Sequence, residues 1–223
     1  MATIDPMHTV YLRVVKTTIK RLIDDKDLNQ DDLKDIQAEI TASSTPSHVG
    51  RIPSKIASRF AFLTAAEWKT FGALFMTCCL DGRIKDKNKR LLIRKLQQVC
   101  FLLECRVLTL SQLEQIHTAI MEFCALDEKI YGPTTKVVFH LICHLKECIL
   151  DYGPSHTFWL FGYERYNGDL GQINTNNRTP ESTLMQKFLV NVELFDRVHD
   201  MKASQLPKPL RNVLERLVST TSV

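Results

Sequence analysis

The sequence predicts a mainly α-helical protein. Apolar residues recur at helical spacing through most of the 223 residues, and candidate N-caps of the Ser, Thr, Asn or Asp type precede several of these stretches. Gly-Pro pairs at Gly132 and Gly153 end two of them. The pattern gives about eight helices and one segment, near residues 156–163, with the character of a strand. We therefore expect a multi-helix domain with a minimal β element.

The first two predicted helices lie at the N-terminus. One runs from about Thr9 to Asp24 and places its apolar residues on one stripe. The next begins after Asn29, a favourable N-cap, and its first turn carries two acids that favour the helix dipole. Residues 41–48 are rich in Ser, Thr and Pro, which is typical of a linker.

The middle of the chain contains three further predicted helices. Thr64 and Glu67 have the spacing of a capping box, and Trp68 is expected to anchor the core. A helix after the basic stretch has the stripe Leu92, Leu96, Val99 and Leu103. Another begins near Thr109 or Ser111, where Ser111 and Glu114 also have capping-box spacing, and continues to about Tyr131.

The segment from residue 136 to residue 151 predicts a helix with one apolar and one polar face. Its apolar stripe consists of Val138, Leu141, Ile142, Leu145 and Ile149. The aromatic run Phe158 to Tyr163 lacks a helical period, which favours a short strand buried on both faces. Pro180 then suits the first position of a helix, and Pro209 to Val218 predicts a last short one.

We expect four residues of the helix that begins at Pro180 to face inward. They are Leu184, Phe188, Val192 and Phe195.

Composition indicates a folded, soluble, intracellular protein. Hydrophobic residues make up 44% of the chain and charged residues 24%, which is enough apolar material for a core. The sequence contains no apolar stretch long enough for a membrane span and no signal-peptide pattern at its start. Seven cysteines without a CxxC pair are expected to stay reduced. The formal charge of +4 permits nucleic-acid binding without requiring it.

Three passages of the chain share a further likeness. They are DPMHTVYLRVVKTTIKRL from Asp5, GRIPSKIASRFAFLTAAEW from Gly50, and GPSHTFWLFGYERYNGDLGQINTNNR from Gly153. In order and spacing they resemble the C-terminal part of transposases encoded by CACTA-type (En/Spm-like) DNA transposons. That family has a "GP, aromatic cluster, F-x-x-ERYNG-x-LG, TNNR" pattern after a histidine-containing helix.

The resemblance implies a catalytic role for two acids. In the intact family enzyme, three acids on an RNase H-like core hold Mg²⁺ or Mn²⁺ for DNA cleavage and strand transfer at transposon ends. Asp5, with His8 as its companion, resembles the second acid, and Glu164 resembles the third. The first acid and its sheet are expected upstream of residue 1. We therefore expect this chain alone, as a C-terminal fragment, not to be catalytic.

The resemblance also implies an organisation and a setting for the chain. Residues 1–8 would be the remnant around the second acid, 9–151 an α-helical insertion domain, and 152–223 a C-terminal segment with the strand, the ERYNG motif and closing helices. The implied partner is DNA at the transposon ends, together with a homo-oligomer, and the implied location is the nucleus. No membrane association is expected.

A basic stretch between Asp81 and Lys95 is the first candidate for contact with DNA. It carries seven basic residues against two acids. The solvated face of a helix is the simpler interpretation, and contact with phosphates is the alternative. The candidate nucleic-acid-binding residues are Lys85, Lys87, Lys89, Arg90 and Arg94 here, with Arg165, Asn176, Asn177 and Arg178 near the C-terminal motifs.

His140, Cys143 and His144 form a second candidate site. Histidines four positions apart on a helix can share a metal ion, and a nearby thiol is a ligand for Zn²⁺. A plain polar helix face is the simpler interpretation. Two alternative functions therefore stand beside the transposase fragment: a non-catalytic helical module that binds DNA or protein, and a zinc-binding helical protein.

Overall fold

The computed structural model describes residues 3–46, 49–133, 137–174 and 179–200 of the chain, with side chains as far as residue 197. It divides into two compact units, Met1–Gly162 and Tyr163–Val223. The described part is helical and contains no strand, so the sheet of an RNase H-like core is not represented in it. The mainly α-helical prediction is confirmed.

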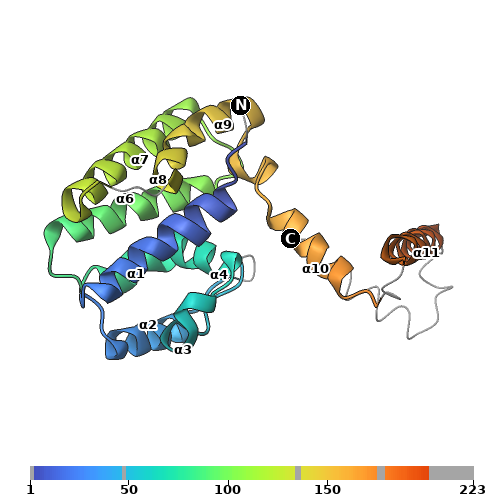
Figure 1. The fold of residues 1–223 in the computed structure, drawn as a ribbon, viewed down its shortest axis with the longest axis horizontal. Coiled ribbons are helices and arrows are strands. Elements are labelled where there is room, and N and C mark those ends of the chain that lie inside the picture. The colour runs from blue at the N-terminus through green and yellow to red at the C-terminus, as the bar shows by residue number, and fades with distance from the viewer. Residues whose placement is uncertain (1–2, 47–48, 134–136, 175–178, 201–223) are drawn as a thin grey trace. The chain divides into compact units, whose positions relative to one another are not determined.

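Helices follow one another through the first unit (Figure 1). Their bounds are η1 (Met7–Val15), α1 (Lys16–Asp24), α2 (Gln30–Ala42), α3 (Ile56–Arg59), η2 (Phe60–Phe62), α4 (Ala65–Thr70), η3 (Phe71–Phe75), α5 (Met76–Leu80), α6 (Lys87–Leu103), α7 (Leu110–Tyr131), α8 (Val137–Leu141), η4 (Ile142–His144), α9 (Leu145–Tyr152) and η5 (Ser155–Thr157). α10 (Phe161–Gly171) begins at the end of this unit, and α11 (Pro180–Asp200) lies in the second.

The N-terminal helix, η1 followed by α1, is the central element of the first unit. Its opening stretch is π-helical and begins at Met7, two residues earlier than the sequence predicts. Tyr11, Val14 and Leu22 are completely buried, because the helix is covered by other helices on its apolar side. This burial positions the residues that precede the helix, including Asp5, against the rest of the unit.

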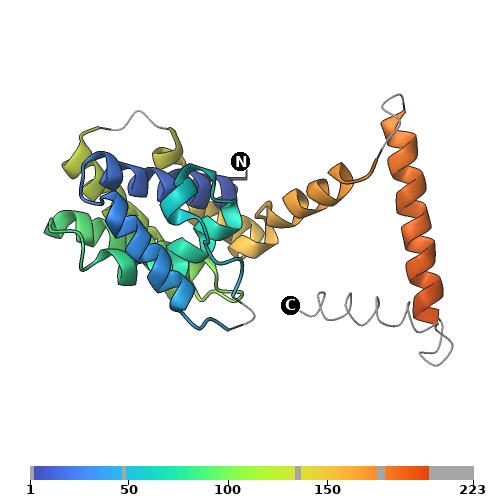
Figure 2. The same cartoon turned by 90° about the horizontal axis from the view of Figure 1, so that it is seen from below.

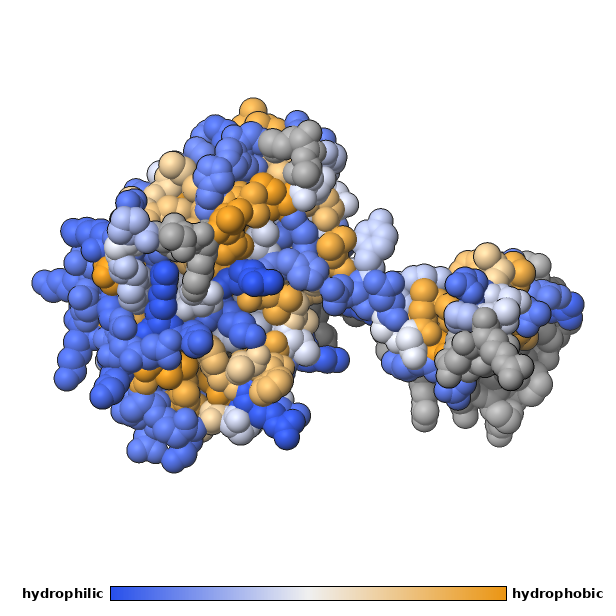
Figure 3. Space-filling model, in the orientation of Figure 1, coloured by the Kyte–Doolittle hydropathy of each residue, from blue (hydrophilic) through white to orange (hydrophobic). Residues whose placement is uncertain are grey.

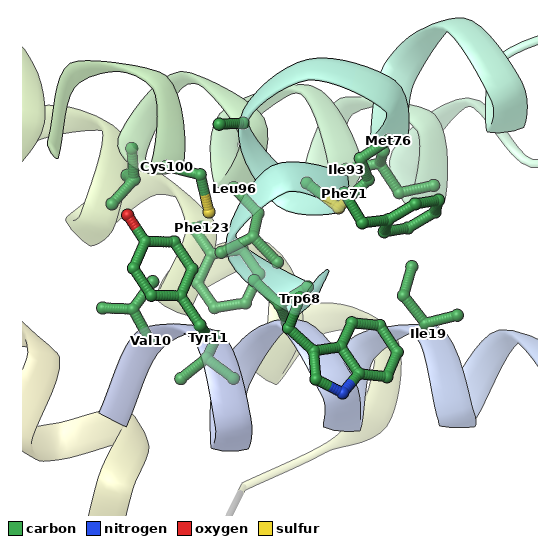
Figure 4. Close-up of a cluster of buried hydrophobic side chains, with 14 of the residues drawn as sticks. Val10, Tyr11, Ile19, Trp68, Phe71, Met76, Ile93, Leu96, Cys100 and Phe123 are labelled. Atoms are coloured by element: carbon green, nitrogen blue, oxygen red, sulfur yellow. The ribbon is translucent and has the colours of Figure 1, made fainter. Parts of the chain in front are cut away.

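The core collects side chains from several helices. In Figure 4, Trp68 lies between Tyr11 and Ile19 of the N-terminal helix, and the ring of Tyr11 points toward Cys100. The indole ring of Trp68 is fully buried and meets the rings of Phe60 and Phe71 edge-on, at centroid distances of 4.9 and 6.1 Å. The expected role of Trp68 as a core anchor is confirmed.

α6 and α7 form the long pair of the unit and lie side by side in both views (Figures 1 and 2). Asp86 caps α6 by accepting hydrogen bonds from two backbone N–H groups of its first turn. Thr109 and Gln112 form the capping box of α7, so the expected box of Ser111 and Glu114 is wrong. The N-cap is Thr109, the first of the two expected starts, and it adopts the extended backbone that a cap requires.

Other helix ends follow the local sequence signals. Asn29 and Asp32 form a capping box at α2, and Thr64 and Glu67 form one at α4. Gly132 and Gly153 end α7 and α9 with positive φ angles of 78° and 87°, a backbone conformation that favours glycine. The expected helix ends at these glycines are confirmed.

The expected strand near residues 156–163 is wrong. Residues Ser155–Thr157 form a 3₁₀ turn, and α10 begins at Phe161. A strand needs a partner for its backbone groups, whereas here the N–H of Trp159 donates to Ser155 O at 2.9 Å. Ser155 is buried and donates its hydroxyl to the carbonyl of Leu103. The aromatic run is therefore apolar because it packs against helices.

The described apolar side chains of the second unit are more exposed than those in the core of the first. Phe188, Val192 and Phe195 of α11 were expected to face inward; with residues of α10 they line a hollow of about 440 Å³. They remain 41–66% exposed. Apolar atoms are visible on this unit in Figure 3. None of its described residues is buried, so the inward prediction is wrong for these three side chains.

Within the described residues, no helix combines the length and the apolar character needed to cross a bilayer.

Candidate functional site

Asp5 caps the N-terminal helix. Its Oδ1 accepts a hydrogen bond from the N–H of Met7 at 3.2 Å, and its Oδ2 accepts one from the N–H of His8 at 3.0 Å. His8 Nδ1 lies 2.5 Å from the same Oδ2. The Asp5 side chain is only 13% exposed. The Asp-x-x-His spacing thus places a carboxylate and an imidazole together over the first turn of the helix.

Asp5 also holds the far end of the first unit. The N–H of Leu160 donates to Asp5 Oδ1 at 3.0 Å, across 155 positions of sequence. Next to this contact, the ring of Tyr11 lies 6.2 Å from that of Phe161, and the ring of Phe161 lies 5.1 Å from that of Trp159. The DPMH passage and the aromatic run before the ERYNG motif therefore meet.

A charged group stands beside this aromatic cluster. Lys69 Nζ lies 4.9 Å from the ring centre of Trp159 and 2.5 Å from Glu104 Oε2. Tyr11 donates its hydroxyl hydrogen to Glu104 Oε1 at 2.7 Å. Burial, followed by the nearby charge of Glu104, raises the pKa of Tyr11 well above its ordinary value. The cluster is held together by these contacts between charged and aromatic groups.

The residues around Asp5 do not fit a two-metal site by themselves. A carboxylate has about four lone-pair positions, and Asp5 already has four hydrogen-bond partners. No group of three or more His, Cys, Asp or Glu side chains in the described part of the chain is arranged to hold a metal ion. Asp5 therefore acts here as a helix cap and as a tether for Leu160.

Glu164 lies on α10, in the second unit. It is exposed and occupies the first turn of the helix, where an acid favours the helix dipole. Arg165, beside it, is also exposed. The sequence pattern placed Glu164 at the end of a strand, but it is helical.

On the His140 face, the two histidines lie close to each other, whereas Cys143 lies close to a cysteine of another helix. The Nε2 atoms of His140 and His144 lie 3.4 Å apart, and His144 Nδ1 lies 3.9 Å from Glu147 Oε1. Cys143 instead approaches Cys124, and their Sγ atoms are 3.9 Å apart. The three predicted zinc ligands therefore do not form one group among the described residues.

Two of the candidate side chains in the basic stretch, Lys89 and Arg94, form ion pairs with acids. Lys89 Nζ lies 2.6 Å from Asp25 Oδ2 and 2.5 Å from Asp27 Oδ2. Burial lowers the pKa of Lys89, but the hydrogen bonds to the two acids outweigh this effect and raise the pKa above its ordinary value. Arg94 pairs with Asp81 at 2.6 Å, and the hydrogen bond from Arg94 lowers the pKa of Asp81.

The other candidate DNA contacts differ in their surroundings. Arg90 donates to the carbonyl of Ile84 at 2.8 Å. Lys85 and Lys87 are exposed, and within the described part of the chain no ion pair of their side chains is found. Asn176, Asn177 and Arg178 lie outside the described residues.

Two features of the site have no signal in the sequence. The contact between Asp5 and Leu160 joins residues far apart in the chain, and backbone N–H groups carry no residue-type signature. The approach of Cys124 to Cys143 depends on the packing of α7 against η4. Both follow from tertiary structure alone.

Comparisons with protein-family models, with curated proteins and with solved structures found no match for this chain.

Proposed function

We propose that the chain is related to the C-terminal part of CACTA-type transposases, and that by itself it associates with DNA without cutting it. The observation that carries the proposal is the meeting of two family-like passages at Asp5 and Leu160. Acids of an RNase H-like site come from distant parts of a sequence. A helical insertion between them must therefore return the chain to its starting point.

The first unit has this property as far as Phe161. Its ring packs on Tyr11, six residues after Asp5, and the ERYNG passage with Glu164 follows directly along the chain. The family relation gives a reason for this return, because Asp5 and Glu164 would be the second and third acids of the intact enzyme. Both carboxylate oxygens of Asp5 accept hydrogen bonds, and these occupy lone pairs that a metal ion would need. This supports an inactive chain.

The first experiment is a cleavage assay on the purified chain. Labelled duplex DNA is incubated with the protein and Mg²⁺ or Mn²⁺, and we expect no products. Robust cleavage that is abolished by Glu164→Ala would overturn the claim that the chain alone is inactive.

A second experiment tests the family relation. The chain is co-expressed with a strand-rich transposase segment that supplies a further Asp, and the complex is assayed for metal-dependent cutting. We expect cutting that Asp5→Asn and Glu164→Gln each abolish, while Glu181→Gln, an exposed acid of α11, leaves it unchanged. Cutting that survives both changes, or a pair that fails to associate, contradicts the assignment.

DNA association is proposed to use the unpaired part of the basic stretch. Lys85 and Lys87 are exposed, whereas Lys89 is held by Asp25 and Asp27. Reversal of Lys85 and Lys87 to Glu should weaken DNA binding and reduce its dependence on salt, because fewer counterions are released. Lys129→Glu, on the exposed face of α7, is the control. Equal weakening by the control, or affinity that is insensitive to salt, contradicts this role.

A further inference from the structure

Two thiols converge on one backbone carbonyl in the first unit. Cys124 of α7 and Cys143 of η4 both approach the carbonyl oxygen of Phe139, at 3.6 and 3.5 Å. Their Sγ atoms are consequently 3.9 Å apart. Both residues are half-buried, so neither is enclosed in the core. The pair joins segments that are 19 positions apart in sequence.

The packing around the thiols holds them in this position. The rings of Phe123 and Phe139, the neighbours of the pair, are buried and stacked, with centroids 6.0 Å apart and an interplanar angle of 13°. Ile142, next to Cys143, is 2% exposed. A disulfide has an S–S distance of about 2.05 Å, so bond formation needs the two sulfurs to approach by rotation of their side chains while the helices stay packed.

The remaining cysteines are placed less favourably for such a bond. Cys100 and Cys148 are completely buried. Cys78 and Cys79 are adjacent residues within α5, where a bond between neighbours would break the helix. The Cys124 and Cys143 pair is thus the favoured point for thiol oxidation among the described residues.

We propose that Cys124 and Cys143 form a redox-active dithiol, a modification site that a low-molecular-weight disulfide such as oxidised glutathione converts into an intramolecular disulfide. This inference is independent of the proposed transposase relation. It requires only the thiol pair, the oxidant and access from solvent.

The reaction proceeds by two exchanges. In one order, the thiolate of Cys143 attacks one sulfur of oxidised glutathione, the glutathione S–S bond breaks, and a glutathione thiolate leaves. The thiolate of Cys124 then attacks Sγ of Cys143 in the mixed disulfide and expels the second glutathione thiolate. The two cysteine protons end on the two glutathione thiols, and the protein loses the two electrons that glutathione disulfide gains.

Either thiol of the pair can make the first attack. Burial, followed by the proximity of Cys143, raises the pKa of Cys124 to about 12. The sulfurs are 3.9 Å apart, so both orders of attack lead to the same disulfide. Once the mixed disulfide has formed, the short distance between the sulfurs favours the second step.

The test is peptide mapping of the full chain. The protein is equilibrated with oxidised glutathione, free thiols are blocked with N-ethylmaleimide, and the tryptic peptides are identified by mass spectrometry. Trypsin places the two cysteines on separate peptides, 107–129 and 137–146, because Arg106, Lys129, Lys136 and Lys146 flank them. We expect a disulfide between these peptides as the main cross-link, and its loss after treatment with dithiothreitol.

Matched variants distinguish a disulfide between Cys124 and Cys143 from unselective oxidation of the other cysteines. Cys124→Ser and Cys143→Ser should each abolish the cross-link, and Cys105→Ser, at a half-buried position elsewhere, should leave it unchanged. The oxidised wild type should melt at a higher temperature than the reduced form, because the bond restricts the unfolded chain. Glutathione retained on Cys143 without a cross-link, or cross-links to Cys105 in equal yield, would overturn the proposal.

Discussion

Asp127 shows how much one buried charge depends on its partner. Its side chain is 1% exposed and forms an ion pair with Arg21, which is 19% exposed. The guanidinium of Arg21 also lies 4.5 Å from the ring centre of Tyr131 and 5.3 Å from that of Phe139. The group thus connects the N-terminal helix to α7 and α8 through a charge that water hardly reaches.

We expect Asp127→Ala to lower the free energy of unfolding by about 3 to 5 kcal/mol, because it leaves the half-buried guanidinium of Arg21 without its acid. Urea denaturation followed by circular dichroism measures the change. Glu128→Ala is the control, since Glu128 is the next residue and is exposed, and it should change stability by less than about 0.5 kcal/mol. Equal losses in both variants would contradict the importance of the pair.

Because the pKa of Tyr11 is raised in the folded state, we expect a loss of stability at alkaline pH. Its folded-state pKa is raised by burial, whereas in the unfolded chain it ionises near pH 10. Below about pH 10 both states keep the proton and the stability is fully present; above it the unfolded state loses its proton first, so the stability falls as pH rises. Tyr131 acts in the same direction, because burial raises its pKa to about 12.

Denaturation curves at about pH 8 and about pH 11 test this expectation. Tyr11→Phe should reduce the alkaline loss, and Tyr163→Phe should not, because Tyr163 is 70% exposed. An unchanged alkaline loss in Tyr11→Phe would assign the effect to other groups.

At the scale of the element, two glycines allow the effect of backbone conformation on stability to be measured without an effect of side-chain packing. Gly132 ends α7 with φ of 78°, and a Cβ added there would meet nothing within 4 Å. Gly82 has the same open space without a positive φ. Any difference between alanine variants at the two positions therefore reports the backbone alone.

We expect Gly132→Ala to lower the free energy of unfolding by about 1 to 3 kcal/mol, because its backbone, with φ of 78° and ψ of 177°, is essentially restricted to glycine. Gly82→Ala should lie within about 0.5 kcal/mol of the wild type. Equilibrium unfolding in urea measures both. A neutral Gly132→Ala would show that the chain can end α7 in another conformation.

At the scale of the whole molecule, the buried core belongs to the first unit. Every described buried residue lies at or before Ser155, and the described residues of the second unit are intermediate or exposed. Hydrophobic burial is the main favourable contribution to folding, so the stability of the first unit should depend little on the second.

We expect a chain that ends at Gly162 to fold and to melt within about 4 °C of the full-length protein. Scanning calorimetry of both forms, with circular dichroism to confirm the helices, is the measurement. A shorter variant that ends before Leu160 is the informative comparison, since it loses the hydrogen bond to Asp5 and should melt lower. Failure of the 1–162 chain to fold would contradict the autonomy of the first unit.

Much of the helical structure could be predicted from local sequence. Asn29, Thr64 with Glu67, and the glycines at 132 and 153 carry their signals within a few residues, because caps and positive φ angles are local properties. The run around Phe158 could not be assigned in this way. A short apolar stretch suits a buried strand and a buried helical segment equally, and only its neighbours decide between them.

The sequence by itself determined the helical class and most helix ends. Tertiary structure decided which distant groups meet: Leu160 with Asp5, Cys124 with Cys143, and Lys89 with Asp25 and Asp27. The physical reason is the distance along the sequence over which each kind of interaction acts. Caps and periodicity act over a few residues, whereas these contacts depend on how whole helices pack, and packing is set by the complementary shapes of side chains that are far apart in the chain.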